Sequence, residues 1–317
     1  MSYAQFGTIS ATDYNALVGG DPVTTSGTLN TVWATGGSTA GYGQAALANV
    51  SVGGTVFASD WANLVNKTAN SASHQGTTIT AVTAPVVGGT ITYLSAIPTN
   101  LTTIYAPRLN AATQGTTVAN TATYGSTWTT QITFTHTISF ANGDAARYFF
   151  NSGGQLKVTC AHANSTSGIN LLLNNLASNV GTVVISAPNS GTANIAGTNY
   201  NGVQKVGGGG NAPTVLTNNG YYALTTSNAN VFTQTASTGP SGYLSTYIRV
   251  IAKSNGTQGT HSDAGSVITL YTLWDEVPDG LTAGTGSATT VTAVVPETTY
   301  LANSWGTITI TGTVASP

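Results

Sequence analysis

Between residues 128 and 140 the chain alternates apolar side chains with hydroxyl-bearing ones. The apolar positions, with one histidine among them, are Trp128, Ile132, Phe134, His136, Ile138 and Phe140. The positions between them are mostly threonine. Successive side chains of a β-strand point to opposite faces of a sheet, so a strand would gather all of these positions on one face. We therefore expect a strand with one buried face, packed against a second layer, and one threonine-rich face.

The same period of two returns in four later runs. Their apolar faces carry Leu156, Val158, Cys160, Leu244, Ile248, Val250, Ile268, Leu270, Trp274, Ile308 and Ile310. Tyr247 and Arg249 share the opposite face of their strand. Turns rich in Gly, Asn and Ser separate the runs, and a helix is expected over residues 169–176. Short strands joined by such turns predict an antiparallel β-sandwich or jelly-roll-like domain over residues 121–317.

Residues 1–120 show helical spacing instead, which predicts a mixed helical and loop region that serves for docking. The fold class is therefore expected to be mainly β with a mixed α/β N-terminal region. Three helices are expected. The first covers residues 13–18, with Thr12 as its cap and Gly19 as its stop. The second starts at Asp60, is capped by Ser59 and has on one face Trp61, Leu64, Val65 and Thr68; the third covers residues 100–112 and has on one face Leu101, Ile104, Tyr105 and Leu109.

Charged residues make up only 5% of the chain, and the net charge is −2. Soluble domains usually carry about 25% charged residues. Few like charges mean little repulsion between copies, and Thr and Asn can form hydrogen bonds across an interface without burying charge. This composition favours a homo-oligomer or assembly subunit. The alternative is a monomeric β protein with a neutral polar surface.

Several classes of partner and compartment are disfavoured. Seven Lys and Arg residues are scattered along the chain and form no basic stripe, which argues against nucleic acid. No apolar run is long enough for a membrane span. The first six residues do not resemble a signal peptide, and Cys160 is the only cysteine, so no intrachain disulfide is expected. These features indicate synthesis in the cytoplasm, while the composition is typical of extracellular assemblies.

Groups able to do chemistry are few. The densest acidic cluster is Asp275, Glu276 and Asp279, which we interpret as a solvated turn after a strand, because calcium sites need several converging oxygens and no EF-hand spacing is present. A glycosidase would need two carboxyl groups across a sugar. Asp144, Asp263 and the three acidic residues of the cluster are the candidates for such a pair.

The remaining candidates are interpreted as structural. The histidines, which lack metal-type spacing, are His74, His136, His162 and His261. His136 is expected to be a hydrogen-bonded histidine of the core or of a subunit interface, and Cys160 a small buried apolar residue. The run 207–210 of four glycines lacks the Lys of a phosphate-binding loop and is expected to be a flexible loop. Tyr and Trp could stack on sugars, but core packing explains them equally well. No catalytic, cofactor-binding or metal-binding residue is predicted, and the chain is not expected to be an enzyme.

The segment 147–155 reads Arg-Tyr-Phe-Phe-Asn-Ser-Gly-Gly-Gln and is followed by a strand. It resembles a segment of virion structural proteins of tailed phages, notably contractile-tailed phages of marine cyanobacteria. The run 171–184 is also similar to the family, and the segments 29–33, 41–44 and 74–76 resemble the N-terminal part of such proteins. Residues 165–168 depart from the family pattern. We expect the two aromatic residues to anchor in the core and Asn-Gly-Gly to form a tight turn. The resemblance implies a virion role and transfers no catalytic residue.

The expected function is therefore a structural subunit of a tailed-phage virion, most simply a multicopy fibre, whisker or connector attached to the neck or tail. Its expected location is the virion, after synthesis in the host cytoplasm. Expected partners are other virion proteins and further copies of the chain, and a host surface glycan is a further candidate. The alternatives are a carbohydrate-binding receptor module and a carbohydrate-cleaving tailspike.

Overall fold

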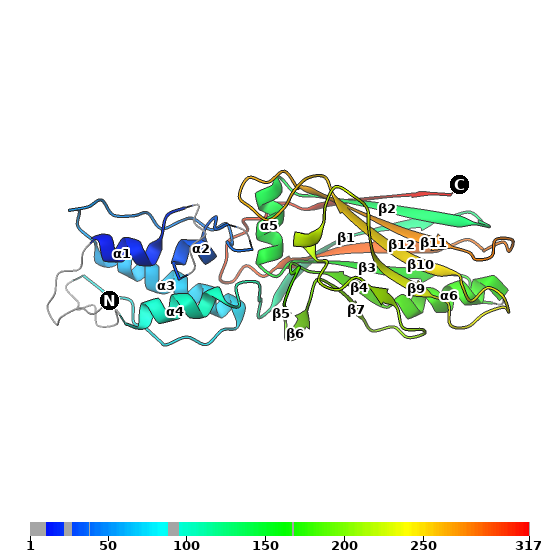
Figure 1. Cartoon of the computed structure of the whole chain (residues 1–317), viewed down its shortest axis with the longest axis horizontal. Helices are drawn as coiled ribbons and strands as arrows, with labels where there is room; N and C mark the ends of the chain where they lie inside the picture. The colour runs from blue at the N-terminus through cyan, green and yellow to red at the C-terminus, as the bar shows by residue number, and fades with distance from the viewer. Residues whose placement is uncertain (1–10, 22–26, 38, 88–94, 167, 317) are drawn as a thin grey trace.

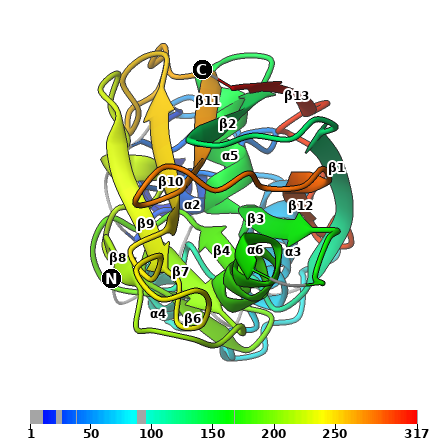
Figure 2. The same ribbon diagram turned by 90° about the vertical axis from the view of Figure 1, so that its right-hand side faces the viewer.

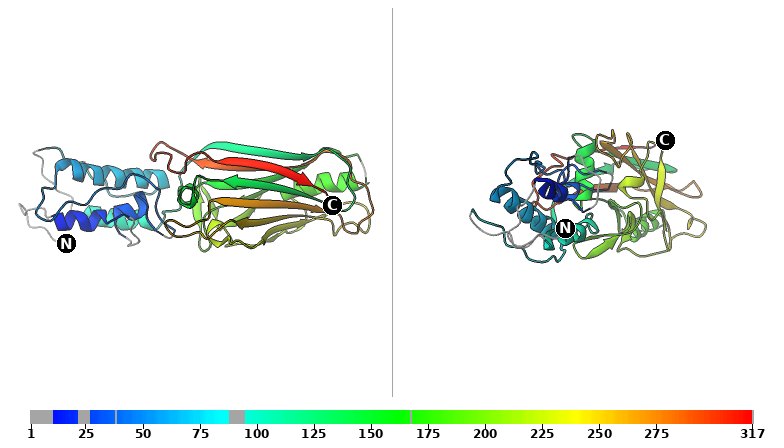
Figure 3. Two further views of the ribbon diagram at one scale, coloured as in Figure 1. Left: turned by 90° about the horizontal axis from the view of Figure 1, so that it is seen from above. Right: turned by 60° about the vertical axis from the view of Figure 1, so that its left-hand side comes forward.

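The computed structural model describes residues 11–21, 27–37, 39–87, 95–166 and 168–316. Four helices lie at one end of an elongated molecule, which we call the helical region (Figure 1). They are α1 (Ala11–Val18), α2 (Leu29–Trp33), α3 (Ala58–Gln75) and α4 (Ala96–Tyr105). Strands running along the long axis form the other end (Figure 3). The fold is mainly β, with an antiparallel sandwich after the helices, which confirms the predicted fold class.

The helical region has its own apolar core. Trp61, Leu64 and Val65 of α3 are buried, as their spacing predicted, and Trp61 packs edge-on against Tyr14 at 5.7 Å between ring centroids. Leu29 of α2 and Leu101 of α4 are fully buried in the same cluster. Residues at helical spacing thus face one another across the four helices. No helix in the described part of the chain has the length and hydropathy needed to cross a lipid bilayer.

Two predicted helix starts are wrong by a few residues. Thr12 lies inside α1, and Ser59 lies inside α3, which begins at Ala58. The cap of α3 comes instead from Asp60, whose carboxylate accepts a hydrogen bond from the Phe57 N–H at 2.9 Å. A carboxylate accepts strongly and is favoured by the helix dipole, so it replaces the expected serine hydroxyl. The predicted stop of α1 at Gly19 is confirmed.

The third predicted helix is too long. Helix α4 ends at Tyr105, two residues before Pro107, which has no N–H to donate to a helical hydrogen bond. Leu109 therefore lies outside the helix and packs against the sandwich core. Strand β1 (Gln114–Tyr124) begins soon afterwards, so the predicted division at residue 120 falls inside a strand. The division into two domains stays a prediction.

Two antiparallel sheets form the sandwich. The five-stranded sheet has the order β1 (Gln114–Tyr124), β12 (Ser287–Pro296), β3 (Gln155–His162), β4 (Thr182–Ile185) and β7 (Val203–Val206). The six-stranded sheet has the order β13 (Thr309–Ala315), β2 (Gln131–Ser139), β11 (Val267–Asp275), β10 (Tyr247–Ser254), β9 (Ala229–Thr235) and β8 (Thr214–Val215). A separate hairpin pairs β5 (Ala193–Ile195) with β6 (Thr198–Tyr200).

Strand β2 confirms the alternation from which the β-domain was predicted. Ile132, Phe134, His136 and Ile138 are fully buried, and the threonines between them are half-buried on the other face. Trp128 precedes the strand and forms an isolated bridge with Ala283. Strand β11 shows the same alternation, and Thr272 lies opposite Phe134 in the register between the two strands. The sheet thus has an apolar inner face and a hydroxyl-rich outer face.

Three details of the other strands differ from expectation. Leu244 lies before β10 and is 47% exposed, because backbone hydrogen bonds from Tyr243 to Pro240 and from Thr246 to Tyr243 close turns there. Ile308 precedes β13. Cys160 lies in β3 as predicted but is half-buried rather than buried.

Helix α6 (Gly168–Val180) confirms and extends the helix expected at 169–176. Its Leu172, Leu173 and Leu176 are fully buried in the core shared by both sheets. Figure 2, which looks along the sandwich from the end remote from the helical region, shows β2, β10 and β11 on one side and β3, β4 and β12 on the other. The helix therefore completes the apolar interior between the two layers.

The outermost strands of the two sheets lie next to one another. Strand β1 contacts β13 along one side of the sandwich, and β7 contacts β8 on the other. Gly312 of β13 makes the first approach possible, because an added Cβ there would overlap the carboxamide oxygen of Asn120 and crowd the ring of His136. Each sheet edge is thus flanked by the edge of the other sheet.

We expect Phe134→Ala to lower the free energy of unfolding by about 3–5 kcal/mol, since it opens a cavity in a fully packed core. Thr135→Ala, on the outer face of the same strand, should cost less than about 1 kcal/mol. Denaturant unfolding of both variants measures the difference. Equal losses in the isolated chain would contradict the division into an inner and an outer face.

Candidate functional site

Helix α5 (Gly143–Asn151) follows β2 and lies between the helical region and the sandwich (Figure 1). The side chain of Asn142 caps it by accepting a hydrogen bond from the Ala145 N–H at 2.8 Å. This helix contains the start of the segment that resembles phage virion proteins. Its two phenylalanines pack in the sandwich, whereas Arg147, Tyr148 and Asn151 contact the helical region, so α5 joins the two halves. We call the contacts of α5 with residues 35–37 and 39–43 the junction.

Two phenylalanines anchor α5 in the sandwich, as the sequence predicted. Phe149 and Phe150 are fully buried and pack edge-on against each other at 4.9 Å between ring centroids. Phe150 also stacks on Tyr221 at 4.3 Å, and Phe140 at the end of β2 packs against Phe149. The turn after the helix differs slightly from expectation, because Asn151 is the last helical residue and Ser152 and Gly153 form the turn.

Arg147 extends from the opposite face of α5 into the helical region. Its side chain is 1% exposed, and its guanidinium donates to the carbonyl oxygens of Ala40 at 2.6 Å and Thr35 at 2.8 Å. It also donates to the Asp144 carboxylate at 3.0 Å from Nη2 and 3.2 Å from Nε. A buried cation is tolerated only when it is paired and hydrogen-bonded, and Arg147 meets both conditions.

Asn151 and Tyr148 add two further contacts to the junction. The Asn151 amide donates to the Gly41 carbonyl at 3.0 Å, and its oxygen accepts from the Tyr222 hydroxyl at 2.5 Å. The ring of Tyr148 lies against Gly43, which has a φ of +68°. A side chain at residue 43 would overlap that ring, so glycine is required there for close packing.

The chain that returns between β12 and β13 forms a second connection. Gln44 donates to the Ala302 carbonyl at 2.9 Å and accepts from the Ala302 N–H at 2.8 Å. The Ser304 hydroxyl donates to the Tyr42 carbonyl, and Leu301 is buried in the core of the helical region. Helix α5 and the chain between β12 and β13 therefore both hold the helical region. The helical region and the sandwich are thus joined at two places, which fixes one relative to the other.

The candidate carboxylates lie at opposite ends of β11. Asp144 and Asp263 lie near its start, where a Cβ at Gly143 would overlap the Asp263 carbonyl. Asp275 is its last residue and accepts hydrogen bonds from Gln131 at 2.9 Å and Tyr247 at 3.0 Å. A strand of this length spans about 30 Å. Neither Asp144 nor Asp263 can therefore pair with Asp275 across a single sugar.

Glu276 is the one carboxylate of the acidic cluster that is buried, with 1% exposure, rather than solvated as predicted. One oxygen accepts a hydrogen bond from the Leu281 N–H at 3.0 Å, and the other has no partner among the described residues. Burial, and to a lesser extent the negative charge of Asp279, raise the pKa of Glu276 to about 7, although the Leu281 N–H acts in the opposite direction. Such a carboxyl changes its charge near neutral pH.

The four histidines lie apart. Burial lowers the pKa of His74 in α3 to about 4, and its ring packs edge-on against Tyr42. His136 is buried in the core, as predicted, and burial lowers its pKa, against the raising effect of the Asn120 backbone. His162 contacts Ser287 and Asn170, and His261 approaches Asp144 at 2.7 Å. Within the described ranges no three metal-binding side chains come together.

Cys160, the glycine run and the tryptophans all have packing roles. Burial raises the pKa of the Cys160 thiol to about 12, which keeps it protonated. Gly208 and Gly210 of the run 207–210 pack against Asn179 at the end of α6, and Lys205 donates to the Gly209 carbonyl, so contacts hold this loop. The tryptophans are buried, which leaves them unavailable as a sugar-stacking platform.

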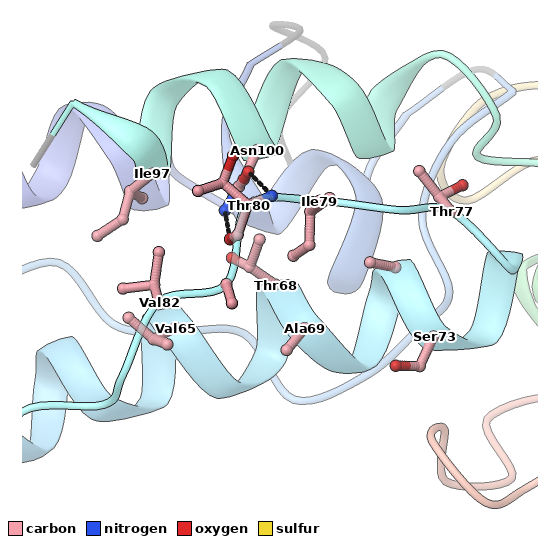
Figure 4. A pocket seen from close by; sticks show the side chains of 12 residues that line it. Val65, Thr68, Ala69, Ser73, Thr77, Ile79, Thr80, Val82, Ile97 and Asn100 are labelled. Carbon is pink, nitrogen blue, oxygen red and sulfur yellow. Dashed lines mark hydrogen bonds between the residues drawn. The ribbon is translucent and has the colours of Figure 1, made fainter. Parts of the chain in front are cut away.

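A groove in the helical region runs between α3 and α4 beside residues 77–82 (Figure 4). It has a volume of 290 Å³, and apolar and small side chains such as Val65, Ala69 and Ile97 line it together with Thr68 and Asn100. The Asn100 side chain accepts from the Thr80 N–H at 3.0 Å and donates to the Thr80 carbonyl at 2.8 Å, which fixes residues 77–82 in place. The lining contains no charged residue.

Replacing Arg147 should loosen the junction. Arg147→Ala leaves two carbonyls and Asp144 without their cation, so we expect a loss of about 3–5 kcal/mol in the free energy of unfolding. The matched control is Arg108→Ala, because the half-buried Arg108 also donates to a carbonyl of this segment, that of Thr39. It should cost about 1 kcal/mol. Equal losses by denaturant unfolding would contradict the central role of Arg147.

Glu276 should make stability pH-dependent. Because its folded pKa of about 7 exceeds the usual value of 4.5, the folded chain binds the proton more tightly, and this stabilisation is lost as pH rises from about 4.5 to above 7. Glu276→Gln should therefore be more stable than the native chain above pH ~7, by about 1–3 kcal/mol, and equal to it below pH ~4.5. Thermal unfolding across this pH range measures the difference.

Glu297 supplies a control of opposite sign. Hydrogen bonds from Thr299 hold the pKa of this exposed carboxyl below its usual value, so Glu297→Gln should be slightly less stable than the native chain above pH ~4.5. A Glu276→Gln difference that did not vary with pH would contradict the raised pKa.

Comparisons with known proteins identify no relative of this chain: no family model matches it, and no curated protein and no solved structure is significantly similar to it.

Proposed function

We propose that the chain is a structural subunit of a tailed-phage virion, a multicopy fibre, whisker or connector protein attached to the neck or tail. The helical region docks on another virion protein and the sandwich projects from it. The subunit is made in the host cytoplasm and then resides in the virion. The observation that carries this proposal is the elongated form, in which a fixed junction separates a helical end from a β end (Figure 1).

The resemblance at residues 147–155 supports the proposal because it now has a physical meaning. In this chain the segment supplies Arg147, Tyr148 and Asn151 to the junction and both phenylalanines to the sandwich core. A subunit that transmits force between a particle and a projecting part needs such a fixed joint. The low charge content of 5% supports multicopy packing, since neighbouring copies repel each other weakly.

Exposed apolar residues mark the end of the helical region that lies away from the sandwich. Phe57, directly before α3, is 63% exposed, and Val86 and Val87 are 72% and 94% exposed. Helix α3 begins directly after Phe57, and its C-terminal end contacts Tyr42 through His74 and Gln75. Residues 77–82 run back beside the helix, so that Val82 lies near Val65 (Figure 4). Exposed apolar patches on a folded protein are typical of interaction sites. We call these three residues the apolar tip and assign docking to it.

A carbohydrate-binding receptor module is the second candidate, and the outer face of the six-stranded sheet favours it. The carbohydrate-cleaving alternative has less support. Glu276 has the raised pKa that a general acid needs. Its neighbour Asp275 would have to act as the second carboxylate, but that carboxylate already accepts hydrogen bonds from Gln131 and Tyr247.

The proposal is tested on particles of the phage whose genome encodes the chain. We expect purified particles to contain several copies, and gold-labelled antibodies against the sandwich to mark the neck or tail in electron micrographs. Particles grown with the variant Val86→Ser/Val87→Ser should lose the label, because the docking surface becomes polar. The control variant Leu244→Ser, which changes an exposed leucine of the sandwich, should keep it. Absence of the chain from purified particles would refute the virion role.

A further inference from the structure

The outer face of the six-stranded sheet carries an ordered array of side chains. The register places Thr311, Thr137, Thr269 and Lys253 in one row, Thr313, Thr135, Tyr271 and Ile251 in the next, and Ala315, Thr133, Leu273 and Arg249 in a third. We call these three rows the outer face. Helix α6 packs on the other side of β10, where Ile248 and Val250 point into the core. The rows remain half-buried or exposed.

Two cations on this face lack a carboxylate partner. Arg249 lies over the ring of Tyr247 at 4.4 Å, and Lys253 lies over the ring of Tyr271 at 5.5 Å. Neither forms an ion pair within the described residues, and the Nε of Arg249 has no hydrogen-bond partner although it is buried. In contrast, Arg147 and Arg108 donate to carbonyl oxygens. Arg249 and Lys253 are therefore free to pair with an anion from outside.

The nearest carboxylate of the sheet does not compensate them. Asp275 lies opposite Tyr247 at the end of β11, and its Oδ2 accepts hydrogen bonds from Tyr247 and Gln131. Arg249 and Lys253 are four residues apart on one strand, so about 13 Å separates their Cα atoms. Ile251, Tyr271 and Leu273 fill the space between them with apolar surface. The face thus offers two separated positive charges, an apolar strip and rows of hydroxyls.

We propose that the outer face binds an acidic polysaccharide, a function that does not depend on docking through the helical region. Two carboxylates of the polymer pair with Arg249 and Lys253. The threonine rows exchange hydrogen bonds with sugar hydroxyls, and the apolar strip packs against the carbon-bearing faces of the sugar rings. An extended polysaccharide fits an extended sheet surface, because its sugar units repeat along the polymer as the rows of side chains repeat along the sheet.

Two other occupants fit this face less well. A nucleic acid needs many phosphate contacts and open aromatic faces, but here only two cations are free and each already covers a tyrosine ring. A second copy related by a two-fold axis would oppose the same face to itself. That arrangement would cover Arg249 and Lys253 of both copies, with only the hydrogen-bonded Asp275 of each copy as an anion.

The test measures binding of the full chain to immobilised polygalacturonate, with uncharged dextran as the reference polymer. We expect binding to polygalacturonate alone, weakening as salt concentration rises. Arg249→Gln and Lys253→Gln should each raise Kd roughly tenfold. The matched control is Lys157→Gln, which removes a half-buried lysine from β3 in the other sheet and should leave Kd unchanged. Thermal unfolding of each variant establishes that it remains folded.

Several results would overturn the proposal. Equal binding to dextran and to polygalacturonate would show that charge does not drive binding. An equal rise in Kd for Lys157→Gln would show that the outer face is not the binding site. Tighter binding to single-stranded oligothymidylate than to polygalacturonate would make the face a nucleic-acid surface. If light scattering showed an oligomer that dissociates in Arg249→Gln/Lys253→Gln, the face would be a contact between copies.

Discussion

A buried guanidinium sets the arrangement of the two halves of this molecule. Arg147 has left water almost completely, and a cation in that position must recover its hydrogen bonds within the protein. Two of them come from carbonyl oxygens 107 and 112 residues away in the sequence. Residues 35–37 and 39–43 therefore close over α5, and Arg147 fixes the orientation of the helical region together with the contacts of Ala302 and Ser304.

Elsewhere, neutral amide side chains take the place that ion pairs occupy in most proteins. Asn15, Asn30 and Asn100 each accept from one backbone N–H and donate to the carbonyl of the same residue, at Val50, Leu47 and Thr80. Gln44 does the same with Ala302. Each side chain thus makes the two hydrogen bonds that a neighbouring strand would make to that residue. The backbone N–H and C=O groups of these extended segments are therefore paired although the segments belong to no sheet. This device accounts for a stable helical region in a chain with so few charges.

The sequence predicted what depends on local periodicity and missed what depends on distant partners. The strand from Gln131 to Ser139 was recognisable because every second residue meets a different environment. The cap of α3 was misplaced by competition between neighbouring acceptors, Ser59 and Asp60. The segment around Phe149 was recognised as an anchor, yet nothing near it indicated that Arg147 would reach Ala40 and Thr35. The buried state of Glu276 likewise depends on how residues 276–281 fold back, which no periodicity records.

The flanking of β1 by β13 and of β7 by β8 bears on how separate copies of the chain can associate. Newly made copies of any β-rich chain can pair through the exposed edges of their sheets. Unpaired strand edges are the usual templates for such fibrous aggregation. In this sandwich each edge faces the edge of the opposite sheet, which obstructs the approach of a foreign strand. Association between copies is thereby confined to side-chain surfaces, and those can be specific.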